Sequence, residues 1–331
     1  MFLTRRSIIA GAAAAFAAAA AGHAAAEAPK RINLDWAYYN PVSLVLKEKG
    51  WIEEEFKKDG IEIRWVQSHG SNKALEFLNA GALDFGSSAG SAALLAKING
   101  NPIQSIYIYS KPEWTALVTR PGSGIKAVAD LKGKRVAVTR GTDPYIFLLR
   151  ALAGAGLSEK DIRPVLVQHA DGRTALERGD VDAWAGLDPM MAETELEKGS
   201  VLFYRNADAN TYGVLNVREA FAKEHPELVI RLLRQYERGR KWSVANPAEL
   251  RDILAKAARL SGPVAAKQLE RTDLSDPLIG EKPHSAILAA AVALQKSGVI
   301  EAKVDVKAVT DALLNPAFVR ETLKRDQASA K

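Results

Sequence analysis

Apolar residues follow two spacings in turn after residue 30, one typical of strands and one typical of helices. The segment IEIRWVQSH (61–69) alternates and predicts a strand, whereas NKALEFLNAG (72–81) has apolar residues on one face and predicts a helix. Ser71 is the expected cap of that helix, and Gly81 is expected to end it. The predicted strands are 31–38, 61–69, 83–88, 102–110, 114–120, 135–140, 163–169, 181–187, 201–206 and 212–218, and the predicted helices include 41–60, 72–81, 89–100 and 189–199.

Strands and helices that alternate in this way predict an α/β fold with parallel sheets covered by helices. The chain has 331 residues, more than the roughly 250–300 at which a single core stops growing. The block 118–211 is a self-sufficient series of strands and helices, so we expect it to form one lobe and 27–117 with 212–331 to form the other. This organisation predicts two mixed, mostly parallel sheets and a ligand cleft between the lobes, beyond the carboxyl ends of the strands.

The first 26 residues do not share this pattern. They contain Arg5 and Arg6, an alanine-rich apolar run, and Ala24-Ala25-Ala26 before Glu27. These features are typical of an export signal of the twin-arginine type that is cleaved near Ala26, so we expect the mature protein in the periplasm. An uncleaved membrane anchor is the alternative, although the apolar run is short for a span of about 20 residues.

Charge and cysteine content narrow the chemistry further. Removal of residues 1–26 lowers the formal net charge from +6 to +4, and no cluster of Lys and Arg stands alone, so nucleic acid is not an expected partner. The absence of cysteine excludes thiol catalysis and Cys-ligated metal. The five histidines are scattered, so the sequence predicts no catalytic residue, no metal site and no cofactor. A monomer is expected.

Three turns between a strand and a helix are rich in small residues, which makes them candidates for binding an anion. Helix N-termini present unpaired N–H groups and about half a positive charge, and glycine and serine let an anion approach the backbone. Ordinary helix capping is the alternative for each single Ser or Thr. The ligand-binding residues predicted in these turns are Gly70, Ser71, Ser87, Ser88, Gly90, Gly141 and Thr142.

Aromatic residues near the predicted strand ends could hold the body of a ligand. Trp36, Tyr38 and Tyr39 end the first strand, and Trp114 lies where the chain passes between the lobes. We include these four residues in the predicted site, although a core position is equally open for Trp36. The same two alternatives apply to Trp184.

Three segments, in the same order and at similar spacing, resemble a known family. They are SHGSNKALEFLNAGALDFGSSAG, IKAVADLKGKRVAVTRGTDPYIFLLRALAGAGLSEKDI and HADGRTALERGDVDAWAGLDPMMA. The sequence from about residue 31 to about residue 315 is similar to the aliphatic sulfonate-binding proteins of ABC importers, within the sulfonate, taurine and nitrate group of periplasmic solute-binding proteins.

The resemblance implies a type II periplasmic binding protein that captures a small organic anion, first of all a sulfonate, and delivers it to an inner-membrane ABC permease. The sulfonate would lie on the helix starts at 87–88 and 141–142. Taurine, nitrate, an aromatic sulfonate or a sulfate ester are alternative ligands, and signalling to a membrane sensor is an alternative role. A pyrimidine synthase of thiamine biosynthesis and an aromatic sulfinate desulfinase also resemble this group, but both depend on cysteines. We therefore expect binding without catalysis.

Two aspartates complicate the anion site. Asp143 follows Gly141-Thr142 where the family usually has Gly-Ser-Asn, and Asp188 precedes Pro189 in a segment that resembles a family W-D-P motif. Each carboxylate either caps a helix or faces a cationic or hydroxyl group of the ligand. Both residues are part of the predicted site.

Overall fold

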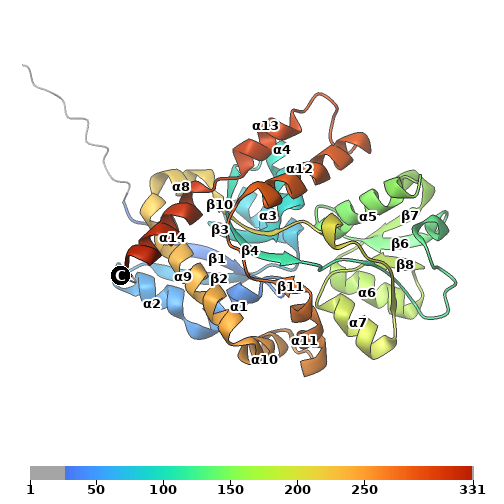
Figure 1. The fold of residues 1–331 in the computed structure, drawn as a ribbon, viewed down its shortest axis with the longest axis horizontal. Helices are drawn as coiled ribbons and strands as arrows, with labels where there is room; N and C mark the ends of the chain where they lie inside the picture. Colours follow the sequence, from blue (N-terminus) through green and yellow to red (C-terminus); the bar gives the residue numbers. More distant parts are fainter. Residues whose placement is uncertain (1–26, 330–331) are drawn as a thin grey trace, which may run out of the picture.

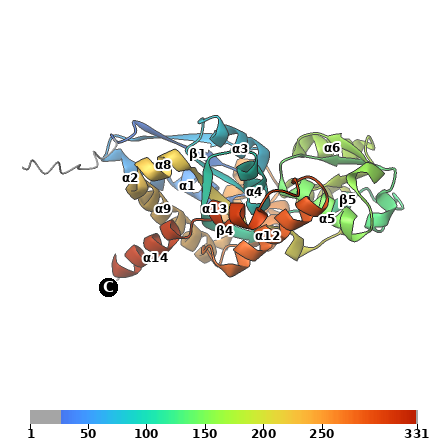
Figure 2. The ribbon, with the colours of Figure 1, turned by 90° about the horizontal axis from the view of Figure 1, so that it is seen from above.

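The computed structural model describes residues 27–329 and contains two β-sheets, each covered by helices (Figures 1 and 2). The larger sheet has six strands in the order β11-β4-β10-β3-β1-β2. The strands are β1 (Arg31–Trp36), β2 (Glu62–Gln67), β3 (Phe85–Ala89), β4 (Ile103–Pro112), β10 (Gly213–Arg218) and β11 (Thr272–Asp273).

The smaller sheet has five strands in the order β7-β6-β8-β5-β9. It is built from one continuous part of the chain, which is drawn in green and yellow in Figure 1. The strands are β5 (Leu117–Thr119), β6 (Arg135–Val138), β7 (Arg163–Leu166), β8 (Ala183–Ala185) and β9 (Val201–Tyr204).

Both sheets are mixed, as the sequence predicts. Strand β1 pairs in parallel with β2 and β3, and β6 pairs in parallel with β7 and β8. Strand β10 returns from the smaller sheet and lies antiparallel between β3 and β4, and β5 is antiparallel to β8 and β9. The strands therefore divide along the chain in the order expected of the two lobes, and the lobe boundaries at 117 and 211 stay a prediction.

Helices cover both faces of each sheet. Around the larger sheet they are α1 (Pro41–Lys49), α2 (Trp51–Lys57), α3 (Ser71–Asn79), α4 (Gly90–Ile98), α8 (Glu219–Glu224), α9 (Pro226–Ala245), α10 (Pro247–Ala258), α11 (Gly262–Glu270), α12 (Glu281–Lys296), α13 (Val306–Leu313) and α14 (Ala317–Ser329). The smaller sheet carries α5 (Asp143–Gly154), α6 (His169–Arg178) and α7 (Met190–Lys198), with short 3₁₀ turns at Val128–Leu131 and Glu159–Asp161 and another at Ala207–Ala209 before β10.

Several of the sequence-based elements have different bounds in the structure, and two of these differences have a clear cause. The helix predicted over 41–60 is broken at Gly50, whose φ of 67° is left-handed and ends α1 before α2 begins. Apolar residues continue on both sides of this glycine, so the break does not show in their spacing. The strand predicted over 114–120 is paired only at Leu117–Thr119, because Trp114 and Thr115 belong to the segment that crosses between the sheets.

The two crossing segments are joined to each other. Asn210 accepts a hydrogen bond from the Thr115 amide through its side-chain oxygen at 2.9 Å, and Arg205 binds both carboxylate oxygens of Glu113 at 2.8 and 2.7 Å. These contacts fix the segments side by side between the lobes.

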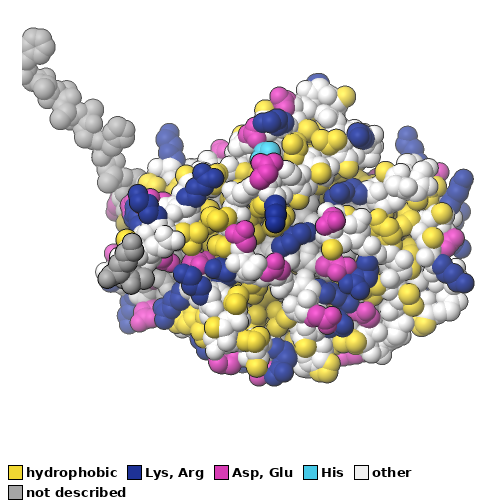
Figure 3. Space-filling view, viewed as in Figure 1, with side chains coloured by type: hydrophobic (Ala, Val, Ile, Leu, Met, Phe, Trp, Pro, Cys, Tyr) yellow, Lys and Arg dark blue, Asp and Glu magenta, His cyan; other side chains and the backbone are white. Residues whose placement is uncertain are grey.

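On the face drawn in Figure 3, basic and acidic side chains are interspersed, and neither sign gathers in one area. Within residues 27–329, no helix combines the length and the apolar character needed to cross a bilayer. The predicted export signal lies outside the described residues.

Candidate functional site

The candidate site is a cavity of about 450 Å³ between the two sheets. It lies at the carboxyl ends of four strands, β1 and β2 from the larger sheet and β7 and β8 from the smaller one. Ligands of open α/β sheets bind at this kind of position. The cavity is lined by Tyr38, Tyr39, Ser68, His69, Lys73, Phe77, Gln168, His169, Ala170, Arg173, Leu187, Asp188, Pro189, Met190, Glu193, Ala258 and Leu260.

Two helix N-termini from opposite lobes meet at this cavity. Helix α3 begins after Gly70 and α6 begins after Gln168, and neither preceding residue caps its helix with a side chain. A methyl group in place of the missing Cβ of Gly70 would lie 3.1 Å from Nε2 of His169, the first residue of α6. The first amides of both helices are therefore free of the usual caps, on either side of one narrow gap.

The cations of the cavity already have acidic partners. Arg173 pairs with Glu193 and, at 3.7 Å, with Glu177, and Lys73 pairs with Glu76 at 2.7 Å. Most other lining residues are apolar or aromatic, such as Phe77. The wall thus suits an organic body, while the helix starts supply positive potential for an anionic group.

His169 is neutral in this environment. The residue is 1% exposed, and burial lowers the pKa of its imidazole from 6.5 to about 3. Its Nδ1 lies 3.3 Å from the hydroxyl oxygen of Thr139, and its Nε2 has no hydrogen-bond partner among the described residues.

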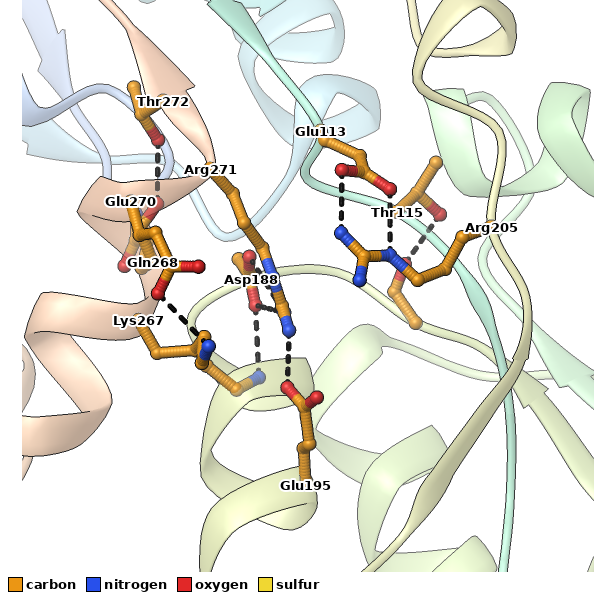
Figure 4. A network of polar contacts seen from close by, with 12 residues as sticks. Glu113, Thr115, Asp188, Glu195, Arg205, Lys267, Gln268, Glu270, Arg271 and Thr272 are labelled. Carbon is orange, nitrogen blue, oxygen red and sulfur yellow. Dashed lines mark hydrogen bonds and ion pairs between the residues drawn. The ribbon is translucent and has the colours of Figure 1, made fainter.

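Asp188 connects the smaller lobe to the larger one (Figure 4). Its Oδ1 accepts from the Ala192 amide at 2.9 Å and lies 3.4 Å from the guanidinium of Arg271, which also binds Glu195. Burial raises the pKa of Asp188 to about 7, and the charge of Arg271 opposes that rise. Asp188 therefore caps α7, lines the cavity and holds an interlobe ion pair at once.

Comparison with known proteins identifies the family. A family model described as NMT1/THI5 like matches residues 42–250. This chain belongs to the NMT1/THI5-like family.

Several known proteins are similar to this chain in sequence or in structure. A Bacillus subtilis (strain 168) protein named for the binding of aliphatic sulfonates is 28% identical over 284 residues, which cover 85% of this chain and 84% of the relative. The periplasmic aliphatic sulphonate binding protein SsuA from Escherichia coli is 25% identical with a TM-score of 0.72, covering 85% of this chain and 91% of SsuA. The alkanesulfonate-binding protein SsuA from Xanthomonas axonopodis pv. citri, bound to MOPS, shares the fold with a TM-score of 0.77 at 24% identity, covering 86% and 99% of the two chains.

In this NMT1/THI5-like chain, the two serines predicted to bind the anion, Ser87 and Ser88, form hydrogen bonds with other residues of the protein. Both the amide and the hydroxyl of Ser87 donate to Oδ1 of the buried Asp35 at 2.8 Å. The hydroxyl of Ser88 donates to the Ala89 carbonyl and accepts from Asn216. Neither serine lines the cavity. Their contact with a ligand stays a prediction, but their donors already have partners.

In the structure, the carboxylate of Asp143 bonds to other segments of the protein and not to the amides of its own helix, and its contact with a ligand stays a prediction. The residue is the first of α5 and makes no capping hydrogen bond. Its carboxylate is 1% exposed and accepts from Ser91 Oγ (2.5 Å), Trp114 Nε1 (2.8 Å), and the amide and hydroxyl of Thr211 (2.9 and 2.8 Å). Asp143 fastens α5 to the start of α4 and to both crossing segments, and it does not face the cavity.

Several other predicted residues also lie away from the cavity. Gly90 donates to the Tyr212 carbonyl and is packed against Ile287 of α12. Thr142 donates to the Thr139 carbonyl at 2.6 Å. Trp36 faces a separate hollow, where Lys47 lies 5.3 Å from its ring centroid. Trp184 is fully buried in the core of the smaller lobe.

The remaining predicted residues are in the cavity wall or next to it. Tyr38 and Tyr39 line the cavity. Ser71 is the first residue of α3, not its cap, and its hydroxyl accepts from the Ala89 amide. Gly141 has a φ of 74°, and a Cβ there would lie 3.4 Å from Cβ of Asn72 in α3, so the starts of α3 and α5 do meet. His69 is exposed and lines the cavity.

Sequence reasoning missed the turn between β7 and α6. Gln168, His169 and Arg173 line the cavity, but the turn has no glycine or serine, and its residues fit the end of the predicted strand 163–169. The signal that could have found it is positional, because each strand of an α/β sheet ends at the same edge as its parallel neighbours.

Proposed function

We propose that this protein is the periplasmic solute-binding component of an ABC importer. It captures a small organic anion, with a sulfonate as the leading candidate, and delivers it to a membrane permease. The observation that carries the proposal is the interlobe cavity, which combines an apolar wall with two uncapped helix starts from opposite lobes. The names of the Bacillus subtilis and Escherichia coli relatives support the same function.

The anionic head would lie at the start of α6. The amides of His169 and Ala170 belong to its first turn, and both residues line the cavity. An anion at this position gains the helix dipole and charge-assisted hydrogen bonds without the need for an unpaired cation. A dissociation constant near 1 μM requires about 8 kcal/mol, which several such bonds and apolar contacts can supply.

We propose that the protein acts by binding and not by catalysis. The chain has no cysteine, and among residues 27–329 no group of three or more His, Asp or Glu residues could hold a metal ion. The acidic groups that line the cavity, Asp188 and Glu193, are each paired with an arginine. Such a wall is suited to holding a solute unchanged.

Calorimetric titration of the purified protein with ethanesulfonate, butanesulfonate, benzenesulfonate and nitrate tests the proposal, with a neutral sugar as the control ligand. We expect at least one sulfonate to bind with micromolar affinity or better. No binding of any anion would refute the proposed function.

A variant pair tests the position of the anionic head. Ala170→Pro removes one amide from the first turn of α6, where proline is tolerated, and α5 already carries Pro144 at the equivalent second position. Ala170→Ser keeps the amide and serves as the control. We expect the proline variant to bind the same sulfonate about tenfold more weakly, whereas equal affinity of the two variants would place the anion elsewhere.

A further inference from the structure

Four cavity-lining residues carry buried polar atoms that have no hydrogen-bond partner in the described part of the chain. These atoms are Ser68 Oγ, Gln168 Oε1, His169 Nε2 and Arg173 Nε, although another nitrogen of Arg173 pairs with Glu193. Ser68 is 2% exposed and His169 is 1% exposed, so bulk water does not compensate for the missing hydrogen bonds. Ser68 follows β2 in the larger lobe, and the other three residues precede, begin or lie in α6 of the smaller lobe. Burial raises the pKa of Asp35 and hydrogen bonding from the Ser68 side chain opposes that rise, whereas Nε2 of His169 has no such contact among the described residues.

The hydrogen bonds around His169 fix which of its nitrogens carries the proton. The hydroxyl of Thr139 has a single hydrogen, and it donates this hydrogen to the Val167 carbonyl at 2.7 Å. The same hydroxyl oxygen can therefore only accept from Nδ1 of His169, 3.3 Å away. With the proton on Nδ1 of a neutral ring, Nε2 is a pure acceptor.

A plain alkanesulfonate cannot satisfy this acceptor, because its sulfonate oxygens only accept and its alkyl chain donates nothing. We propose that the solute carries a hydroxyl or N–H group that donates to Nε2 of His169, so that the ligand class is a hydroxy- or amino-substituted organic anion. This inference rests on the proposed function and narrows it.

The position of His169 also sets how the two groups of the solute are related. His169 begins α6, so its side-chain acceptor and the uncapped amides that attract the anion belong to the same turn. The charged groups in the same wall are Lys73, Arg173, Asp188 and Glu193, and each is already paired. The donor of the solute and its anionic head therefore both bind at the start of α6, and His169 selects the donor.

Two pairs of sulfonates that differ only by a hydroxyl in place of a methyl group test the inference. The short pair is 2-hydroxyethanesulfonate and propane-1-sulfonate, and the long pair is 4-hydroxybenzenesulfonate and 4-methylbenzenesulfonate. An unpaired buried acceptor strongly disfavours the analogue that lacks the donor. We expect the hydroxyl compound of at least one pair to bind about tenfold more tightly than its methyl partner, as measured by calorimetry.

Two variants connect the preference to His169. His169→Phe keeps a ring of similar size without the acceptor, and Thr139→Val removes the group that holds the proton on Nδ1. Both should reduce the hydroxyl preference to about threefold or less. Thr174→Val is the matched control, because this threonine of α6 is partly exposed, does not line the cavity and donates to the Ala170 carbonyl. If His169→Phe does not fold, Thr139→Val alone tests the role of His169.

Equal affinities within both pairs would overturn the inference and leave the proposed function intact, whereas failure of all four sulfonates to bind would overturn both. A preference that survives Thr139→Val unchanged would also overturn it. Equal affinities that weaken as the pH rises would mean that His169 takes up a proton and meets the sulfonate itself, which contradicts the assigned donor.

Discussion

Replacement of Asp143 separates the role found in the structure from the role of a ligand contact. Its two oxygens have different partners. Oδ2 accepts from Trp114 Nε1 and the Thr211 amide, whose hydrogens have fixed directions, and Oδ1 accepts from the hydroxyls of Ser91 and Thr211, which can rotate. An asparagine can therefore keep its oxygen at the Oδ2 position and donate its NH₂ group to the hydroxyls. A leucine leaves both fixed N–H groups without an acceptor.

The two substitutions should differ in cost. Asp143→Asn exchanges charged hydrogen bonds for neutral ones, which lowers the free energy of unfolding by about 1–2 kcal/mol. Asp143→Leu is close in size but leaves buried donors unpaired, so the loss should be about 3–5 kcal/mol. At roughly 2 °C per kcal/mol for a chain of this size, the midpoints of thermal unfolding should fall by about 2–4 °C and 6–10 °C.

Thermal unfolding followed by circular dichroism and by tryptophan fluorescence measures both shifts, and calorimetry gives the sulfonate affinity of each folded variant. The hydrogen-bond partners of the carboxylate do not line the cavity, so the affinity of Asp143→Asn should stay within about threefold of the unchanged protein. Equal destabilisation by Asn and Leu would refute the division of the two oxygens. A large loss of sulfonate affinity without loss of stability would indicate that Asp143 contacts the ligand.

Three further predictions concern the same junction. Burial raises the pKa of Asp35 from 3.8 to about 6, so the free energy of unfolding falls as the pH rises through that range. Measured by urea unfolding, the free energy of unfolding of Asp35→Asn relative to that of the unchanged protein should increase by up to about 3 kcal/mol from pH 4 to pH 7.5. An equal difference between the two proteins at both pH values would contradict this. Arg271→Met leaves the carboxyl of Asp188 buried without its cation. Because the pKa of Asp188 is raised to about 7, this carboxyl is charged at pH 8.5 and mostly neutral at pH 5.5, so the fall in unfolding temperature should be larger at pH 8.5. A fall that does not depend on pH would argue against the ion pair. Gly70→Ala places a methyl group 2.8 Å from Asn72 Oδ1 and 3.1 Å from the ring of His169. Because both side chains must give way at the cavity, the variant should bind a sulfonate about tenfold more weakly by calorimetry, and unchanged affinity would show that the start of α3 does not contact the solute.

The sequence predicted the fold well because the fold depends on repeated patterns. The alternation of β1, β2 and β3 with helices is visible in the spacing of apolar residues, and so is the series from β6 to β8. The break at Gly50 was not visible, because a single left-handed residue changes the direction of the chain without interrupting its apolar pattern. The antiparallel place of β10 was also not predictable from spacing, since it is set by the return of the chain from the smaller sheet.

The site was predicted less completely because small residues at a helix start are compatible with two opposite uses. Such a turn can receive a ligand, or it can receive another part of the protein that has come equally close. Ser87 follows the second use, because the carboxylate of Asp35 on the neighbouring strand β1 reaches it first. Small residues predict that another group comes close to the backbone at this turn. Only the fold shows whether that group is a ligand or a side chain such as Asp35.

The same distinction explains how the junction both holds the lobes and keeps a cavity. The turns after β3 and β6 follow inner strands of their sheets and are joined by a hydrogen bond that the Ser91 hydroxyl donates to the Asp143 carboxylate. The turns after β2 and β7 follow edge strands of their sheets, and the helices that begin there have no side-chain caps at their N-termini and line the cavity. The contact between Ser91 and Asp143 is complete without a ligand. The gap between the turns after β2 and β7 is therefore the place where a solute can form hydrogen bonds with both lobes. Loss of the Asp143 contact should therefore alter the spacing of the lobes before it alters the chemistry of the cavity.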